Sequence, residues 1–272
     1  MEGSSEKEIH RCAYCGKDFS AEEPFSHVIP RQFFLRFKRG TQNKEAYSTY
    51  FGRATQREPK EFLLCRSCET TFSKWESDFA LNITNKLYDI PLPGQLRIDQ
   101  RTKLAALSIL WRIIHCWVVG LKKWRGTLNE KDLQFVSTIE ESWLDILRQQ
   151  RDYSREEGNA FLIPIDCIKN SDEAILSYKK YPGISATVVF HDQGDGKGFY
   201  CVRCLAHKIL IFAYLTPAFS LPRSFSIHNN YIDTTPAFMP PAIVGTFIDY
   251  AKNASNVKTN VPSSKRSNFR KN

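Results

Sequence analysis

The spacing of apolar residues changes along the chain from a helical period to a strand pattern. In SCETTFSKWESDFALNITNKL the large apolar residues recur every three or four positions, as on one face of a helix: Phe72, Trp75, Phe79 and Ile83. Residues 104–121, LAALSILWRIIHCWVVGL, and residues 129–150 are predicted to form two more helices. From Phe161 onward the apolar runs have strand length, in FLIPIDC, ISATVVFHD, GFYCVRCLA and HKILIFAYL. The pattern predicts an α+β protein with a helical segment followed by a mainly antiparallel β C-terminal half.

Breaks in the pattern predict four segments. Residues 1–9 are polar and are expected to be disordered, and residues 10–90 form a first module. IPLPG at residues 90–94 ends its last helix. Residues 91–251 are expected to form an α+β domain without an assigned role, with a short helix near 242–252, and residues 252–272 a basic disordered tail. Within the first module, FLLC at residues 62–65 has the composition of a short strand leading into the helix.

The run at residues 104–121 is long enough to cross a membrane. Arg112 and His115 at its centre would each be costly in lipid, and Lys122 and Lys123 end it. We therefore predict a buried core helix and no membrane contact, with His115 as a core residue whose polar atoms are satisfied. The N-terminal MEGSSEKEIH is polar and acidic, unlike a signal peptide, so a cytoplasmic location is expected.

Four cysteines carry the clearest chemical signal: Cys12 and Cys15 in CAYC, and Cys65 and Cys68 in CRSC. Each CxxC turn aims two thiolates at one point, and two turns complete the tetrahedral site that Zn²⁺ prefers. We predict a structural zinc ion there; the alternative is four unconnected core thiols. Zinc would close the intervening 49 residues into a loop that contains a single histidine, His27 in SHVIPR.

The other four cysteines are predicted to be structural. Cys116 lies in an apolar helix and Cys167 follows an apolar run. Cys201 and Cys204 form a third CxxC, which with His207 offers three metal ligands and lacks a fourth. Eight cysteines in a chain without a signal peptide indicate a reducing compartment and favour metal binding over disulfides.

Positive charge is concentrated in two stretches of the chain. The formal net charge is +9, of which residues 31–60 contribute +6 and residues 252–272 another +6, so that the remainder is net negative. Such clusters are typical of surfaces that bind phosphates, although a solvated cationic loop or a solubilising tail would look the same.

The segments CAYCG, SHVIPR and FLLCRSCETTFSKWE, within residues 10–80, resemble the HNH endonuclease family, whose nuclease core is a ββα-metal motif. Many members carry two CxxC zinc knuckles at these places. The resemblance implies that residues 10–90 are an HNH-like, zinc-stapled nuclease module. It also implies that His27 is the general base and that Glu69, directly after Cys68, binds a catalytic divalent ion, Mg²⁺ or Mn²⁺.

Two polar positions depart from the family pattern. Ser26 stands where an Asp or Glu commonly helps to bind the metal, and Lys60 falls about where a middle Asn is expected. The chemistry is otherwise coherent, because phosphodiester cleavage needs a base for water and a cation for the developing charge. An imidazole supplies the first, and a carboxylate such as Glu69 suits a hard cation. Glu76 shares the helix face of Glu69 but is about 10 Å away along the axis, so it ranks lower.

These observations predict a metal-dependent endonuclease acting on DNA, with RNA as the other candidate substrate. The residues expected to hold the phosphate backbone are basic: Arg31, Arg36, Lys38, Arg39 and Lys60. An inactive zinc-knuckle protein that binds nucleic acid or serves as an adaptor is the main alternative, favoured by the two altered positions. A protein-interacting scaffold is the third. The α+β half could sense a small-molecule activator, bind a protein partner or position DNA, in a restriction, phage or defence setting.

Overall fold

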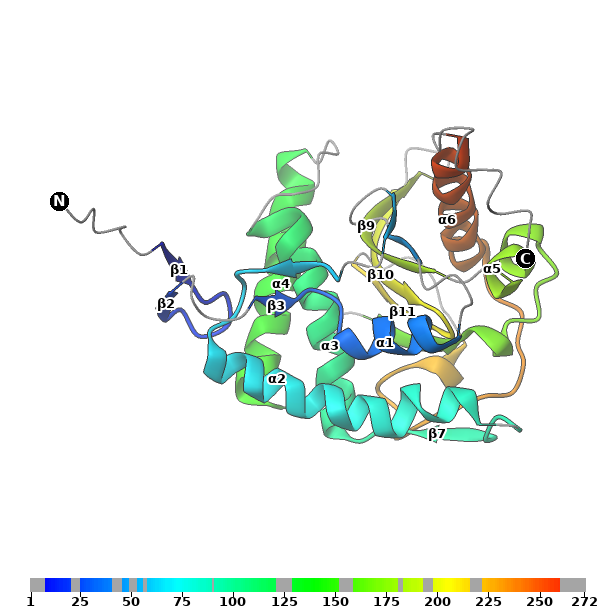
Figure 1. Ribbon diagram of the computed structural model, residues 1–272, viewed down its shortest axis with the longest axis horizontal. Helices are drawn as coiled ribbons and strands as arrows, with labels where there is room; N and C mark the ends of the chain where they lie inside the picture. The colour runs from blue at the N-terminus through cyan, green and yellow to red at the C-terminus, as the bar shows by residue number, and fades with distance from the viewer. Residues whose placement is uncertain are drawn as a thin grey trace.

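The structure is a computed structural model of the 272-residue chain. It describes the following residues: 8–20, 25–40, 46–48, 53–55, 58–89, 91–120, 129–151, 159–180, 183–192, 198–215 and 222–259. Residues 1–7 and 260–272, which belong to the two segments predicted to be disordered, lie outside this set. The fold mixes helices with largely antiparallel sheets, as the apolar pattern predicts (Figure 1).

The first part of the chain combines two short strand pairs with a helix. Strands β1 (Ile9–Arg11) and β2 (Asp18–Ser20) form a hairpin, so Ile9, within the segment predicted to be disordered, lies in a strand. Strand β3 (Ser26–His27) pairs antiparallel with β6 (Lys60–Glu61). Helix α1 (Arg31–Gly40) follows β3, and helix α2 (Arg66–Phe79) follows β6.

The predicted strand at residues 62–65 is wrong by two positions, because the strand is Lys60–Glu61. Leu63 N bonds back to Glu61 O at 2.9 Å, which ends the strand in a tight turn. Leu63 and Leu64 are apolar because they are buried beneath the first CxxC turn, where Ala13 N donates to Leu63 O at 2.9 Å. A buried segment outside a strand can therefore show the same run of apolar residues as a buried strand.

The second part contains a six-stranded sheet in the order β5-β4-β9-β10-β11-β8: Arg53–Thr55, Ala46–Ser48, Ile184–Asp192, Gly198–Ala206, Ile209–Tyr214 and Asn159–Pro164. Neighbouring strands are antiparallel except β4 and β9, which pair in parallel. Because β4 and β5 come from residues 46–55, the first part of the chain supplies one edge of this sheet. The two parts separated by the predicted boundary near residue 90 therefore share a sheet and one hydrophobic core.

Helix α3 (Gln100–Ile114) is the centre of that core. It continues as a π-helical turn, His115–Val119, and packs against α2, against α4 (Glu130–Gln149) and against β9, β10 and β11. The 20-residue run Gln100–Val119 is apolar and long enough to span a membrane, but 78% of its most apolar window is buried inside the protein. His115 Nδ1 lies 3.0 Å from Glu140 Oε1, which also accepts from Trp111 Nε1 at 2.6 Å, so His115 is a satisfied core residue.

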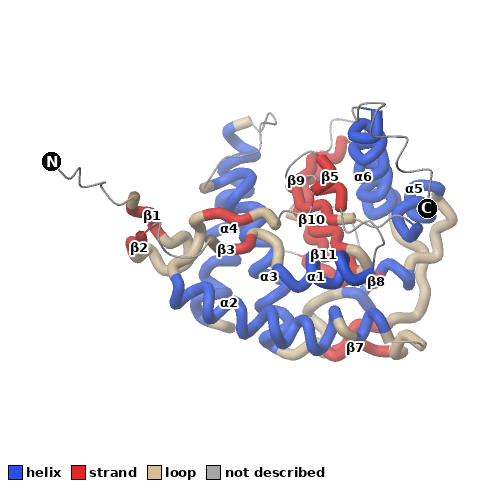
Figure 2. The backbone as a smooth tube through the Cα atoms, in the orientation of Figure 1, coloured by secondary structure: helices blue, strands red, loops and turns tan. Residues whose placement is uncertain are grey.

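Two further helices flank the sheet, α5 (Glu173–Lys180) and α6 (Pro241–Thr259), which lie beside each other (Figure 2). Strand β12 (Tyr231–Asp233) pairs with β7 (Gln95–Arg97). Helix α6 runs to Thr259, so the tail predicted to be disordered from residue 252 is helical over its first eight residues. The buried side chains of Ile243, Phe247 and Tyr250 anchor this helix, and its basic last turns contain no proline or glycine to stop it.

Candidate functional site

Two turns bring the four cysteines of the CxxC motifs together. Cys12 N donates to Lys17 O at 2.8 Å and Gly16 N to Cys12 O at 2.9 Å, so the β1–β2 hairpin closes around the first pair. Gly16 has φ +74°, a left-handed conformation that favours glycine. Cys65 is the N-cap of α2 and Cys68 lies in its first turn, which aims the second pair at the first.

The sulfur positions fit one tetrahedral ion. All four Sγ atoms lie within 4.8 Å of one another, and Cys15 Sγ is 3.8 Å from Cys65 Sγ. Zn–S bonds of about 2.3 Å in a tetrahedron separate the sulfurs by about 3.8 Å. The cysteine cluster could therefore hold a metal ion such as zinc, as the spacing predicts.

The thiols of the cluster differ in acidity. Burial raises the pKa of Cys12 and of Cys68 above the ordinary thiol value. At Cys65 burial also opposes ionisation, but hydrogen bonds from the Ser67 hydroxyl and the Cys68 backbone amide outweigh it and lower the pKa to about 6. A thiolate at the start of a helix is the form that binds a soft metal.

The third CxxC does not form a comparable cluster. Cys201 and Cys204 are fully buried on β10, and an odd separation along a strand puts their side chains on opposite faces of the sheet. Burial raises the pKa of each thiol to about 12. His207, the third candidate ligand, bonds to Tyr88 instead. These cysteines are structural, as are the buried Cys116 and Cys167.

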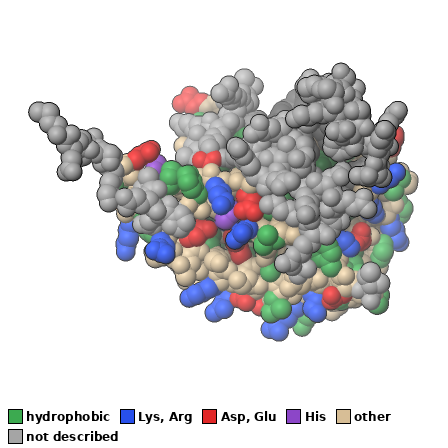
Figure 3. Space-filling view, in the orientation of Figure 1, with side chains coloured by type: hydrophobic (Ala, Val, Ile, Leu, Met, Phe, Trp, Pro, Cys, Tyr) green, Lys and Arg blue, Asp and Glu red, His purple; other side chains and the backbone are tan. Residues whose placement is uncertain are grey.

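His27 lies at the end of β3 beside an acidic and a basic side chain. Its Nε2 is 2.9 Å from Glu58 Oε2, and Arg31 Nε is 3.9 Å from the same carboxylate oxygen. The Glu58 side chain is only 11% exposed, whereas Arg31 is 65% exposed. Figure 3 shows basic and acidic side chains interspersed on this face of the molecule. The arrangement presents an imidazole to solvent with a carboxylate that fixes its orientation.

The backbone of His27 is held by a buried arginine from the second part of the chain. Arg112 on α3 is fully buried, and its Nη1 donates to His27 O at 2.6 Å. Its Nη2 donates to Glu76 on α2, and its guanidinium carbon lies 5.5 Å from the centre of the Phe72 ring. Glu76, ranked low as a metal ligand, is thus the partner of Arg112.

Glu69 presents a carboxylate oxygen that no group in the described part of the chain satisfies. The residue lies in the first turn of α2, directly after Cys68, and its Oε2 is buried without a hydrogen-bond partner there. A buried carboxylate oxygen without a partner is costly unless a cation or water satisfies it. This atom therefore fits the role of a ligand for a hard divalent cation.

Ser26 and Lys60, the two positions that depart from the family pattern, differ in their exposure to solvent. Ser26 is fully buried, and its Oγ accepts from Leu64 N at 3.0 Å. Lys60 is exposed on β6, directly across from His27.

Among the described residues, the cysteines are the one group of three or more His, Cys, Asp or Glu side chains that lie close enough to share an ion. His27 and Glu69 are thus not gathered into a second such group.

The remaining predicted phosphate-binding residues lie on α1. Arg31 begins this helix four residues after His27, and Arg36, Lys38 and Arg39 lie further along it. The side chains of these last three are outside the described set. Sequence reasoning missed Glu58, whose only signal is an acid within a basic stretch, and the role of Arg112, whose signal is a charge inside an apolar helix.

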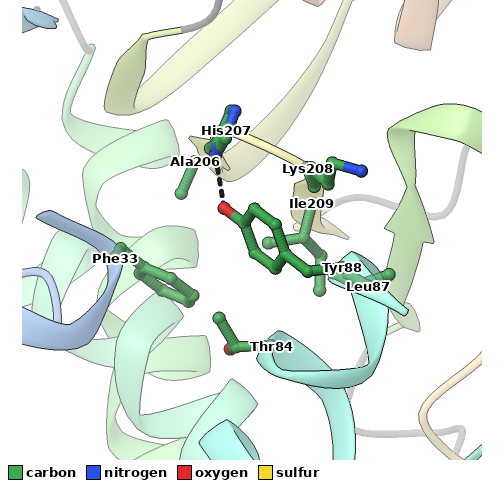
Figure 4. A pocket seen from close by; sticks show the side chains of 8 residues that line it. All are labelled: Phe33, Thr84, Leu87, Tyr88, Ala206, His207, Lys208 and Ile209. Carbon is green, nitrogen blue, oxygen red and sulfur yellow. Dashed lines mark hydrogen bonds between the residues drawn. The ribbon is translucent and has the colours of Figure 1, made fainter. Parts of the chain in front are cut away.

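A small hollow lies where the first part of the chain meets the sheet (Figure 4). Tyr88 points across it and bonds through its hydroxyl to His207 Nδ1 at the β10–β11 turn, while Lys208 Nζ lies 5.1 Å from the centre of the Tyr88 ring. Burial lowers the pKa of His207 to about 4, so the imidazole is neutral at pH 7. The hollow is thus lined by residues from both parts of the chain.

No family model matches the chain, and the searches of curated proteins and of solved structures found no match. The resemblance to HNH endonucleases therefore rests on the sequence motifs within residues 10–80.

Proposed function

We propose that the chain is a metal-dependent endonuclease in which His27 is the general base and Glu69 helps to hold a divalent cation. The observation that carries the proposal is the buried carboxylate oxygen of Glu69, which has no hydrogen-bond partner among the residues that the structure describes. It lies at the start of the helix that follows the strand pair of His27, and the cysteine cluster caps that helix. A strand pair, a helix and a four-cysteine cluster in this order support an HNH-like module with a structural zinc ion.

His27 would remove a proton from the attacking water. When Glu58 accepts the hydrogen bond from Nε2, the lone pair of the neutral ring is on Nδ1, which can take up that proton. A base held by a carboxylate is the usual arrangement for activating a nucleophile. Arg112 holds the backbone carbonyl of His27, and Glu58 holds the ring through Nε2.

The cation and the basic surface would handle the charge of the substrate. A bound Mg²⁺ or Mn²⁺ supplies charge neutralisation at the phosphate and at the leaving oxygen. Glu69 offers the oxygen ligand that such ions prefer, while the four thiolates suit zinc. Arg31 and Lys60 are exposed beside His27 and would hold phosphates of DNA, or of RNA as the other candidate.

A second candidate is a zinc-knuckle protein that binds nucleic acid, or serves as an adaptor, without cleaving it. The observation that favours it is the position of Ser26, whose hydroxyl is committed to the backbone of Leu64 and is not available to a cation. The absence of a gathered second metal group among the described residues points the same way.

The test is cleavage of supercoiled plasmid and of a structured RNA by the full-length, zinc-loaded protein with Mg²⁺, with Mn²⁺ or without divalent ion. His27→Ala should lower the rate about 10²- to 10⁴-fold, the range that a general base contributes. Glu69→Gln should raise the Mg²⁺ concentration needed for half-maximal cleavage.

Glu173→Gln is the matched control for Glu69→Gln, because Glu173 is also a carboxylate in the first turn of a helix. It should leave the metal requirement unchanged, which separates metal binding from a favourable helix-terminal charge. Cleavage that survives His27→Ala with zinc retained would exclude the proposed base. Salt-dependent binding of DNA or RNA without any cleavage would favour the second candidate.

A further inference from the structure

Three aromatic rings form a stack beside the cysteine cluster. The Phe25 and Phe62 ring centres are 4.1 Å apart at an interplanar angle of 30°, and Phe62 stacks on His10 at 4.1 Å and 13°. Buried Phe19, the β-pair partner of His10, supports the stack from behind at 5.8 Å. Phe25 forms the open end, since 47% of it is exposed to solvent.

The cysteine cluster holds this stack in place. His10 lies two residues before Cys12, and Phe62 lies three residues before Cys65, so the stacked rings come from the two segments that lead into the cysteine cluster. Leu63 O accepts from Ala13 N at 2.9 Å directly beside Phe62. A bound metal would therefore fix the aromatic surface as well as the helix.

The stack lies next to His27. Phe25 directly precedes strand β3 and lies two residues before His27, a span of at most about 6.6 Å along extended backbone. Lys60, across from His27, precedes Phe62 by two residues and is exposed. The aromatic pair Phe25 and Phe62 thus flanks one end of the strand pair that carries His27 and Lys60.

We propose that Phe25 and Phe62 form a stacking surface for an unpaired base of a single-stranded or locally opened nucleic acid. An aromatic face with neighbouring cations is the usual means of binding single strands, and each stacked base contributes appreciably to affinity. A base inside a duplex has both faces covered by its neighbours and cannot stack on Phe25. The inference rests on the proposed function in one respect only, namely that the phosphate adjoining the stacked base lies at His27.

The test measures stacking without cleavage. Full-length, zinc-loaded His27→Ala protein, without added divalent ion, is titrated into a single-stranded oligonucleotide that carries 2-aminopurine, whose fluorescence falls when it stacks. Fluorescence should fall, and Phe25→Ala should weaken binding about 5- to 100-fold. Phe25→Leu keeps an apolar side chain without a ring and should weaken it comparably, whereas Phe25→Trp should retain it. Zinc content is measured for each variant, so that a folding defect is recognised.

Two matched controls sharpen the result. Phe238, 73% exposed and in the C-terminal part of the chain, should tolerate Phe238→Ala without a change in affinity. An oligonucleotide with abasic sites keeps its phosphates but lacks bases at those sites. It should bind the protein with Phe25 intact about as weakly as the normal strand binds the Phe25→Ala variant.

Three outcomes would overturn the inference. The first is equal affinity for abasic and normal strands, which would mean that phosphate contacts alone account for binding. The second is an equal effect of Phe25→Ala on single strands and on duplex. The third is a dimer that Phe25→Ala converts to a monomer in sedimentation, which would make this face a protein interface. Because the readout is fluorescence, the stacking surface can fail while plasmid cleavage persists, and the reverse.

Discussion

Replacing Arg112 with methionine should both destabilise the fold and loosen His27. Arg112 is fully buried and donates to the His27 carbonyl and to the Glu76 carboxylate. Methionine has a similar length and fills the space, but it leaves both acceptors without their donor. Removing one partner of a buried ion pair costs about 3–5 kcal/mol of unfolding free energy. At about 2–4 °C per kcal/mol for a chain near this size, the melting temperature should fall by about 6–20 °C.

The effect on His27 is separable from the loss of stability. Arg203 on β10 is the matched control, because its side chain is only 3% exposed and donates to Asp249 on α6 at 3.1 Å. Arg203→Met should also lower the melting temperature. Only Arg112→Met should accelerate backbone hydrogen exchange at Val28, whose amide donates to Pro59 O at 3.0 Å next to His27.

The assays are thermal unfolding and hydrogen exchange with mass spectrometry on zinc-loaded proteins, at a temperature where both variants are folded. Plasmid cleavage at that temperature reports whether the base is also displaced. A melting temperature within about 2 °C of the wild type would refute the view that Arg112 is a structural anchor. Equal exchange near Val28 in both variants would refute its specific hold on His27.

Three shorter predictions concern other contacts. Cys65→Ala should abolish zinc binding, measured as metal per chain by mass spectrometry, whereas Cys201→Ala should retain it; zinc loss in both would contradict the assignment of ligands. Stability to urea should fall as the pH is lowered from about 6.5 towards 4, because the folded-state pKa of His207 is lowered to about 4 and the unfolded chain then binds the extra proton. His207→Asn should flatten that slope, and an unchanged slope would exclude His207 as its source. Ser26→Ala should cost about 1–3 kcal/mol in urea unfolding, because Leu64 N is left buried without an acceptor, and a cost near zero would count against this bond.

The parts of the fold and site that sequence predicts are those governed by local spacing. Two residues between cysteines fix each knuckle turn, and the cluster follows once both turns face each other. The helix faces around Trp75 and Trp111 follow from the three-to-four residue period, and the buried centre at Arg112 follows from the cost of that charge in lipid. The long strands β9, β10 and β11 are apolar because both sheet faces are covered.

Contacts between distant segments could not be predicted in this way. Glu58 reaches His27 across 31 residues, and nothing in the basic stretch that contains it distinguishes this acid from a solvated one. Strands β4 and β5 have three residues each, too few for a period to emerge, although they extend the main sheet. Arg112 is visible as an anomaly, but its partners depend on how α2 and α3 pack.

The first CxxC turn is joined to the helical core by direct contacts with helix α4. Tyr14 OH donates to Leu147 O at 3.0 Å, and Arg148 Nε donates to Tyr14 O at 2.6 Å, so the end of α4 holds the turn that carries Cys12 and Cys15. Helix α3 holds the strand of His27 through Arg112. A metal ion bound by the four cysteines would fix only the two ends of the loop between Cys15 and Cys65. His27 lies within this loop, 12 residues after Cys15. The position of His27 therefore depends on the second part of the chain as much as on the metal, and a change of packing around α3 would reach the candidate base directly.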